Sequence, residues 1–139
     1  MKKLTKAYLD FLTHEIIGSA IEVHKEMGPG LLEKVYEACM IHELGLRNIK
    51  VQSQQILPVH YKGVDLDADI RYDLLVENCI VVELKAVKDM IPLFHAQTMS
   101  YAKLLKVPKS ILINFTCTNI FHNGQKTFVN EYFRDLPDK

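Results

Sequence analysis

Apolar residues recur at helical spacing through the first part of the chain. Between about Leu4 and Met27 they predict an amphipathic helix, which the Gly28-Pro29-Gly30 segment ends. A second helix is expected from about Leu31 to Leu44. The apolar positions of the first helix are Tyr8, Phe11 or Leu12, Ile16, Ala20, Val23 and Met27, and the expected buried side of the second holds Leu32, Val35, Cys39 and, just beyond it, Leu46.

After residue 50 the pattern indicates strands. Residues 51–61 predict one strand or a bent pair, because Pro58 cannot donate to a ladder and favours an edge or a bulge. In residues 64–73 every odd position is charged and the even ones are mostly apolar, which is typical of a half-buried strand with Asp73 on its polar face. Glu77-Asn78 indicates a turn, and residues 79–87 are apolar enough for a strand buried on both faces.

The rest of the chain predicts one more helix and further strands. Pro92 fits the first turn of a helix that runs to about Lys106, and residues 111–115 predict a short buried strand. Asn123-Gly124, between the apolar pairs 120–121 and 128–129, predicts a final hairpin of two strands. The order α-α-β-β-β-α-β-β favours the α/β (α+β) class, with a central mixed β-sheet flanked by helices.

Three charged residues stand among the apolar residues of the central hairpin. If its turn is centred near Asn78, facing residues have numbers that sum to about 156, so Asp73 faces Glu83. Facing Cβ atoms lie roughly 4.5–5.5 Å apart, and two like charges at that separation destabilise a sheet. Lys85, two residues beyond Glu83, projects from the same face. The two acids and the amine are therefore expected to converge.

Two interpretations of this cluster differ in whether a cation is involved. In the first, Glu83 and Lys85 lie on a solvated strand face and neutralise each other. Against it, the neighbouring residues, among them Val82, Leu84 and Ala86, leave little sign of a wet face, and burying unpaired ions costs roughly several kcal/mol each. Ligation of a hard, oxygen-seeking cation such as Mg²⁺ by the carboxylates is the simpler explanation.

Composition limits the classes of protein that fit. The 139 residues, 48% of them hydrophobic, suffice for a core, and we expect a single domain over residues 1–139. Lys plus Arg equals Asp plus Glu at 17 each, which argues against coating nucleic acid by bulk charge. Cys39, Cys79 and Cys117 lack metal-type spacing and are expected to be reduced core thiols. Without a bilayer-length apolar run or a signal-peptide core, we expect no membrane association and a cytoplasmic location.

The hairpin with Asp73, Glu83 and Lys85, followed by a helix and a strand, resembles the core of the PD-(D/E)XK nuclease superfamily. The segment Gly30-Leu31-Leu32-Glu33-Lys34-Val35-Tyr36 resembles the signature that names the GxxExxY protein family, a branch of that superfamily. Further matching segments are residues 23–30, 73–77 and 82–86, His95-Ala96-Gln97 with Tyr101, and residues 113–115. The resemblance runs from about Ile16 to Phe115 and implies a PD-(D/E)XK nuclease-like core.

The resemblance also implies a metal-dependent site. Asp73 and Glu83, with the backbone carbonyl of Leu84, would bind a divalent cation, Mg²⁺ or Mn²⁺, and Lys85 would orient or deprotonate the attacking water. Such an ion neutralises charge that gathers on a phosphodiester oxygen, and the ammonium of Lys85 adds a second positive group beside it. Lys85 need not be neutral for the latter role.

The remaining candidates lie on the predicted helices. Glu33 would complete or support the metal site, or is an exposed helix residue that pairs with a neighbour such as Lys34. Tyr36, one turn later, would hydrogen-bond the acid or the substrate, or is a core aromatic. Gln97 resembles a glutamine that contacts the site in several branches, and its amide donates and accepts. His95 and Tyr101 are secondary candidates, and His24 and Arg71 are site-lining candidates without an assigned role.

Two functions from different classes follow. The first is a metal-dependent nuclease that hydrolyses DNA or RNA, and the second is a catalytically silent nuclease-fold homodimer that binds nucleic acid or another protein. Asp65, Asp67 and Asp69 do not favour a groove for nucleic acid, and a run of lysines compensates in part or forms a solvated face. These lysines are Lys85, Lys88, Lys103, Lys106 and Lys109. In a third interpretation, ranked last, the carboxylates are structural.

Overall fold

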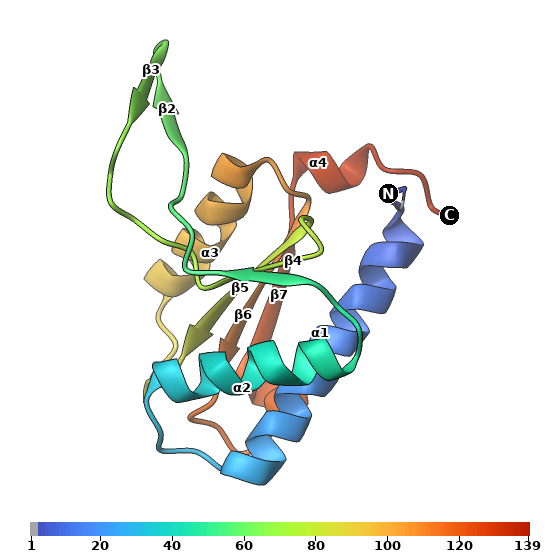
Figure 1. The fold of residues 1–139 in the computed structure, drawn as a ribbon, viewed down its shortest axis with the longest axis vertical. Helices are drawn as coiled ribbons and strands as arrows, with labels where there is room; N and C mark the ends of the chain where they lie inside the picture. Colours follow the sequence, from blue (N-terminus) through green and yellow to red (C-terminus); the bar gives the residue numbers. More distant parts are fainter. Residues whose placement is uncertain (1–2) are drawn as a thin grey trace.

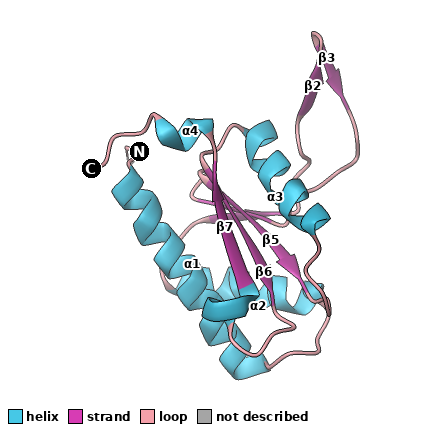
Figure 2. Ribbon diagram, turned by 180° about the vertical axis from the view of Figure 1, so that it is seen from behind, coloured by secondary structure: helices cyan, strands magenta, loops and turns pink. Residues whose placement is uncertain are grey.

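A mixed five-stranded sheet lies at the centre of the computed structural model, which describes residues 3–139 (Figure 1). Its strands, in spatial order, are β1 (Val51–Ser53), β4 (Leu74–Val76), β5 (Ile80–Lys85), β6 (Lys109–Asn114) and β7 (Gln125–Val129). Helices α1 (Lys6–Met27) and α2 (Glu33–Leu46) pack on one face and α3 (Pro92–Leu105) on the other (Figure 2). Strands β5 and β6 run parallel, with α3 as their crossover. The predicted fold class is confirmed.

Helix α1 confirms the first predicted helix. Its start is capped by Thr5, whose side chain accepts a hydrogen bond from the backbone N–H of Tyr8. Of the pair Phe11 and Leu12, Leu12 is the buried residue, whereas Phe11 is exposed. The helix ends at Gly28, whose φ of 71° lies in the left-handed region that favours glycine.

Helix α2 is rotated relative to the prediction. Its buried residues are Tyr36, Met40 and Leu44, spaced by four, and the ring of Tyr36 stacks on Phe115 with 4.3 Å between centroids. The prediction that Leu32 and Leu46 are buried is wrong. Leu32 precedes the helix and is 76% exposed, and Leu46, in the last position, is 66% exposed. The packing of one large aromatic ring on the sheet, which is a tertiary contact, sets which face of α2 is buried.

The central hairpin has the predicted register. Leu74 pairs with Val82 and Val76 with Ile80, so Asp73, the residue before β4, comes next to Glu83 of β5. Three residues, Glu77, Asn78 and Cys79, form the turn between the last pair; the first two have positive φ, 49° and 57°, and the N–H of Cys79 donates to the carbonyl of Val76 at 3.0 Å.

Residues 58–70 form an extension that stands away from the sheet and is called the ribbon here (Figure 1). Its strands β2 (Val59–Tyr61) and β3 (Val64–Leu66) pair with each other, and residues 60–71 are all exposed. The prediction of one half-buried strand over residues 64–73 is therefore wrong. The alternation instead separates two faces of the ribbon, because Val59 and Tyr61 pair with Leu66 and Val64, while His60 pairs with Asp65. A half-buried strand and an exposed two-stranded ribbon both give a period of two, so the alternation alone does not distinguish them.

The predicted C-terminal hairpin is also wrong. Residues 120–124 form a π-helical turn, and β7 pairs with β6 rather than with residues 120–121. Gly124 is required here by close packing, since a Cβ atom added to it would lie 2.7 Å from Sγ of Cys117. A short helix, α4 (Glu131–Arg134), follows. Cys39, Cys79 and Cys117 are all free thiols, with Cys79 buried and the other two half-buried.

Candidate active site

Asp73, Glu83 and Lys85 lie on the side of the sheet that faces α3. Along β5 the even residues Val82 and Leu84 belong to the core under α1 and α2, whereas the odd residue Val81 belongs to the core under α3. Side chains alternate along a strand, so Glu83 and Lys85 project toward α3. The three residues named from the sequence thus share one face.

Each of the carboxylates of Asp73 and Glu83 accepts a hydrogen bond from a backbone N–H of the opposite segment of the hairpin. The N–H of Asp73 donates to Oε1 of Glu83 at 3.2 Å, and the N–H of Leu84 donates to Oδ2 of Asp73 at 2.8 Å. Glu83 is 7% exposed. Burial, and then the negative charge of Asp73, raises the pKa of Glu83 from 4.5 to about 9. Without a cation the pair therefore holds a proton at neutral pH.

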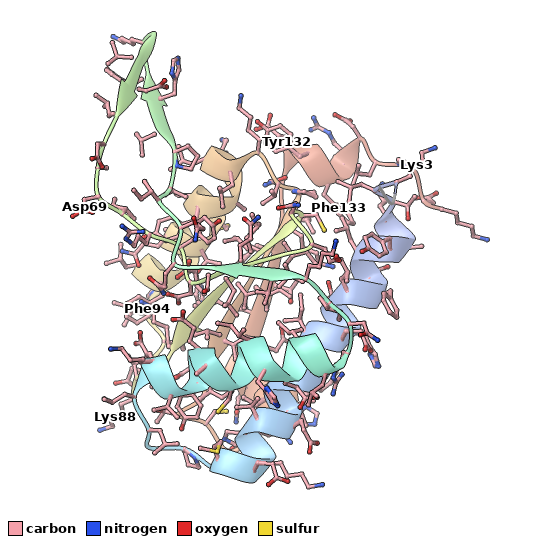
Figure 3. The ribbon with its side chains drawn as sticks, in the orientation of Figure 1. Lys3, Asp69, Lys88, Phe94, Tyr132 and Phe133 are labelled. Atoms are coloured by element: carbon pink, nitrogen blue, oxygen red, sulfur yellow. The ribbon has the colours of Figure 1, made fainter. Side chains whose placement is uncertain are left out.

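Lys85 is held at the end of β5 with its ammonium over an aromatic ring. Its Nζ lies 4.4 Å from the ring centroid of Phe94, a residue of the first turn of α3 that is labelled in Figure 3. The backbone after Lys85 is fixed by Asn114 of β6, whose side-chain amide bonds both the N–H and the carbonyl of Val87. The N–H of Phe115 donates to the carbonyl of Lys85 at 2.9 Å. Strand β6 thus fixes the position from which Lys85 projects.

Helix α3 brings Gln97 and Tyr101 to the same region. Gln97 follows Phe94 by three residues and Tyr101 follows it by seven, so all three lie along one face of the helix. Burial, and then the charges of Glu83 and Asp73, raises the pKa of Tyr101, which places its hydroxyl in the field of both carboxylates. The amide of Gln97 makes no hydrogen bond with any residue from 3 to 139. Along α3, Gln97 lies between Phe94, whose ring contacts Lys85, and Tyr101.

Glu33 is not brought to the carboxylates. It is the exposed first residue of α2, and no hydrogen bond or ion pair within residues 3–139 joins it to Asp73 or Glu83. Glu37, one turn later and half-buried, is the helical acid that lies near Asp73. Nε2 of Gln54 donates to Oε2 of Glu37 at 2.9 Å and to Oδ1 of Asp73 at 3.1 Å. Neither Glu37 nor Gln54 was among the site residues predicted from the sequence.

A pattern in the sequence could have pointed to Glu37 but not to Gln54. Residues four apart on a helix share a face, so Glu37 is an alternative to Glu33 wherever α2 meets the hairpin. Gln54 reaches Asp73 because β1 pairs with β4 across more than twenty residues, with Ser53 opposite Leu74. That pairing is not set by a local turn, so its register cannot be predicted from the sequence.

Tyr36 is a core aromatic, which is the second of the two alternatives. It is fully buried, and its hydroxyl donates to the carbonyl of Gly28 at 2.6 Å and accepts from the N–H of Leu31 at 3.1 Å. It therefore connects the loop between α1 and α2 to the core. No hydrogen bond within residues 3–139 joins it to Glu33.

Replacing Tyr36 with Phe is expected to lower the free energy of unfolding by roughly 1–3 kcal/mol, because the carbonyl of Gly28 and the N–H of Leu31 lose their partner. Urea denaturation followed by circular dichroism measures the change. Tyr61→Phe on the exposed ribbon is the matched control and is expected to stay within about 0.5 kcal/mol of the parent protein. Equal stability of the two variants would contradict this role of the Tyr36 hydroxyl.

Three histidine and arginine candidates have other surroundings. The ring of His95 packs on Phe128 of β7, 5.7 Å between centroids. Nε2 of His24 lies 3.0 Å from the carbonyl oxygen of Cys117. Arg71 is adjacent to the site, since its Nη1 donates to the carbonyl of Gln54 at 2.8 Å. Arg71 is therefore linked to Asp73 through Gln54.

The lysines predicted as one basic run do not share a surface. Lys88, Lys103 and Lys106 are exposed, whereas Lys109 is 5% exposed and its Nζ lies 3.6 Å from Oδ1 of Asp10. Lys85 lies on Phe94 in the candidate site. Lys109 thus makes a structural contact between β6 and α1, and the basic surface is smaller than the sequence indicates.

The family model described as the PD-(D/E)XK nuclease superfamily matches residues 10–127, a range that contains Asp73, Glu83 and Lys85. The chain belongs to the PD-(D/E)XK nuclease superfamily. No match was found among curated proteins or among solved structures. Within residues 3–139, no helix is both long enough and apolar enough to cross a bilayer.

PD-(D/E)XK nucleases generally use divalent metal ions, and the residues of this member fit such an ion. Two adjacent carboxylates supply the hard oxygen donors that Mg²⁺ and Mn²⁺ prefer. A cation would also relieve the repulsion that raises the pKa of Glu83 to about 9. No three His, Cys, Asp or Glu side chains of residues 3–139 form a complete ligand group. Mg²⁺ needs only one or two carboxylates, because it keeps several of its waters.

Proposed function

We propose that this member of the superfamily is a metal-dependent nuclease that hydrolyses phosphodiester bonds of DNA or RNA with Mg²⁺ or Mn²⁺. The observation that carries the proposal is the contact between Asp73 and Glu83, with Lys85 on the same face of the sheet. Neither carboxylate has a cationic partner within 4 Å among residues 3–139, so the pair is available to a metal ion.

Each of these residues has a distinct role in the proposal. Asp73, Glu83 and the backbone carbonyl of Leu84 would hold the cation. When bound, a divalent cation lowers the pKa of a coordinated water and neutralises charge on a phosphodiester oxygen. Lys85 orients the attacking water and places a positive charge beside the scissile phosphate, and the ring of Phe94 restricts its ammonium to this side of the sheet. Gln97, with an amide free of protein partners among the described residues, contacts the phosphate.

The finer family assignment belongs to the same proposal. Gly30, Glu33 and Tyr36 have the spacing of the GxxExxY signature, and the structure gives Gly30 a φ of 98° and Tyr36 a buried position. In this branch the helical acid would support the metal site. Glu33 holds the motif position, but Glu37 has the contact to Asp73 through Gln54. Parallel variants, Glu33→Gln and Glu37→Gln, distinguish which of them affects cation affinity.

Calorimetric titration with Mg²⁺ and Mn²⁺ tests the proposal. The protein is expected to bind at least one of the ions, and Asp73→Asn is expected to lose binding while its circular dichroism spectrum stays unchanged. Cleavage of single-stranded DNA, duplex DNA and RNA is then assayed with each ion and with excess chelator. Absence of both binding and cleavage in a folded protein would contradict the proposal.

The second candidate is a nuclease-fold homodimer that binds other molecules without cutting. The ribbon favours it, because Tyr61, Val64 and Leu66 form an exposed apolar face beside the half-buried Val59, and the opposite face carries His60 and Asp65. The formal net charge of zero agrees with a module that does not depend on bulk electrostatics. Light scattering after size exclusion measures the oligomeric state. A dimer that binds no cation would favour this candidate over the nuclease.

A further inference from the structure

Gln54 lies between two carboxylates that come from different parts of the fold. A single nitrogen, Nε2, donates to Glu37 of α2 at 2.9 Å and to Oδ1 of Asp73 at 3.1 Å. The two acids carry like charges, which repel each other. A neutral amide separates them without adding a positive charge, so the site keeps its negative charge for a cation.

The backbone of Gln54 is held in an unusual conformation. Its φ is 52°, in the left-handed region that non-glycine residues rarely adopt. Both of its backbone polar groups are bonded, since its N–H donates to the carbonyl of Asp73 at 3.1 Å and its carbonyl accepts from Nη1 of Arg71 at 2.8 Å. A strained residue that its surroundings fix in this way is a common feature of functional sites. Here the conformation directs the side chain to the Asp73 carboxylate.

Both oxygens of the Asp73 carboxylate are thereby fixed. Oδ2 accepts from the N–H of Leu84 at 2.8 Å, and Oδ1 accepts from Gln54. A carboxylate held at both oxygens cannot rotate about its Cβ–Cγ bond, and each oxygen keeps a lone pair for a further ligand. Residues that orient a metal ligand in this manner alter metal affinity although they do not touch the ion.

Gln54 also lies where the ribbon joins the sheet. Beyond the last β1–β4 pair, Ser53 with Leu74, the chain continues through the contact of Gln54 with Asp73 and the bridge of Ile56 with Arg71. Asp69, which is labelled in Figure 3, lies on the returning segment of the ribbon. The orientation of Gln54 is therefore set by the base of the ribbon on one side and by α2 on the other.

We propose that Gln54 is a positioning residue of the candidate active site, which orients the Asp73 carboxylate and links it to Glu37. This proposal rests on the nuclease function for its effect on metal binding. Its effect on Asp73 itself does not depend on any metal. The two can therefore be tested separately.

The experiment compares Gln54→Met, which keeps the size of the side chain and removes the amide, with Gln55→Met. Gln55 is the adjacent exposed residue, and its Nε2 bonds the carbonyl of Ser53 rather than a carboxylate. In the metal-free proteins, NMR measures the shift and the exchange rate of the Leu84 amide, which donates to Asp73. Gln54→Met is expected to move this resonance and to speed its exchange about tenfold, with unchanged melting temperature and unchanged amides at Val81 and Val82. Gln55→Met is expected to leave all of them unchanged.

Calorimetry with Mn²⁺ completes the test. Gln54→Met is expected to weaken Mn²⁺ binding about tenfold, within the range known for residues that orient a metal ligand, and Gln55→Met is expected to have no effect. An unchanged Leu84 amide in Gln54→Met overturns the positioning role, whatever the metal result. A shifted Leu84 amide in a protein that binds no Mn²⁺ supports the positioning role and removes the proposed nuclease function instead.

Discussion

Replacing Glu83 with Gln is expected to stabilise the metal-free protein, by about 3 kcal/mol at pH 7. Glu83 is 7% exposed, and the pKa of its carboxyl is raised from 4.5 to about 9 by burial and by the charge of Asp73. Between these two pH values the folded protein binds one more proton than the unfolded chain. Stability is therefore lost progressively as the pH rises from about 4.5 to about 9. Glutamine has no proton to lose, so the variant escapes this loss.

Urea denaturation at several pH values between 5 and 9, in the presence of a chelator, measures the effect. The difference between Glu83→Gln and the parent protein is expected to grow with pH, whereas Glu26→Gln, at an exposed position of α1, is expected to change stability little at any pH. Added Mg²⁺ or Mn²⁺ should stabilise the parent protein more than the variant. If Glu83→Gln instead lowers stability at every pH, the carboxylate is a structural group, as the third interpretation of the sequence holds.

The arrangement of Asp73 and Glu83 was predictable because it depends on local sequence. A short turn centred on Asn78, residues 77–79, fixes the pairing of the strands on either side, and a period of two then puts Lys85 on the same face. The helix before this hairpin and the one after it were also predictable from apolar spacing and from Pro92. Each of these features needs information from only a few neighbouring residues.

The features that sequence analysis missed depend on tertiary contacts. Gln54 meets Asp73 through the pairing of β1 with β4, and Glu37 is linked to Asp73 through this same Gln54 side chain. Gly124 looked like a turn residue but is packed against Cys117. In each case the residue type is explained only by a neighbour that is distant in sequence.

Replacing Lys85 with Met is expected to reduce metal-dependent cleavage of nucleic acid on the order of 10²–10³-fold, because the transition state loses the positive group beside the scissile phosphate. The effect is expected in the rate of cleavage rather than in cation affinity. Lys85 does not contact Asp73 or Glu83 through an ion pair within residues 3–139, so both carboxylates keep their positions in the variant. The apolar chain of methionine still packs on Phe94, so the fold is retained.

A single-turnover assay with Mn²⁺ compares Lys85→Met with Lys88→Met, a matched change at an exposed lysine three residues along the chain. Lys88→Met is expected to keep nearly all of the activity. Calorimetry should show Mn²⁺ affinity of Lys85→Met within a few fold of the parent, which distinguishes loss of chemistry from loss of the ion. Equal residual cleavage by Lys85→Met and by Glu83→Ala, matching that of the parent protein, would mean that the activity comes from a contaminating nuclease. In that event the carboxylate pair would have no role in cleavage, and the non-cutting homodimer would become the better account of the ribbon and the neutral surface.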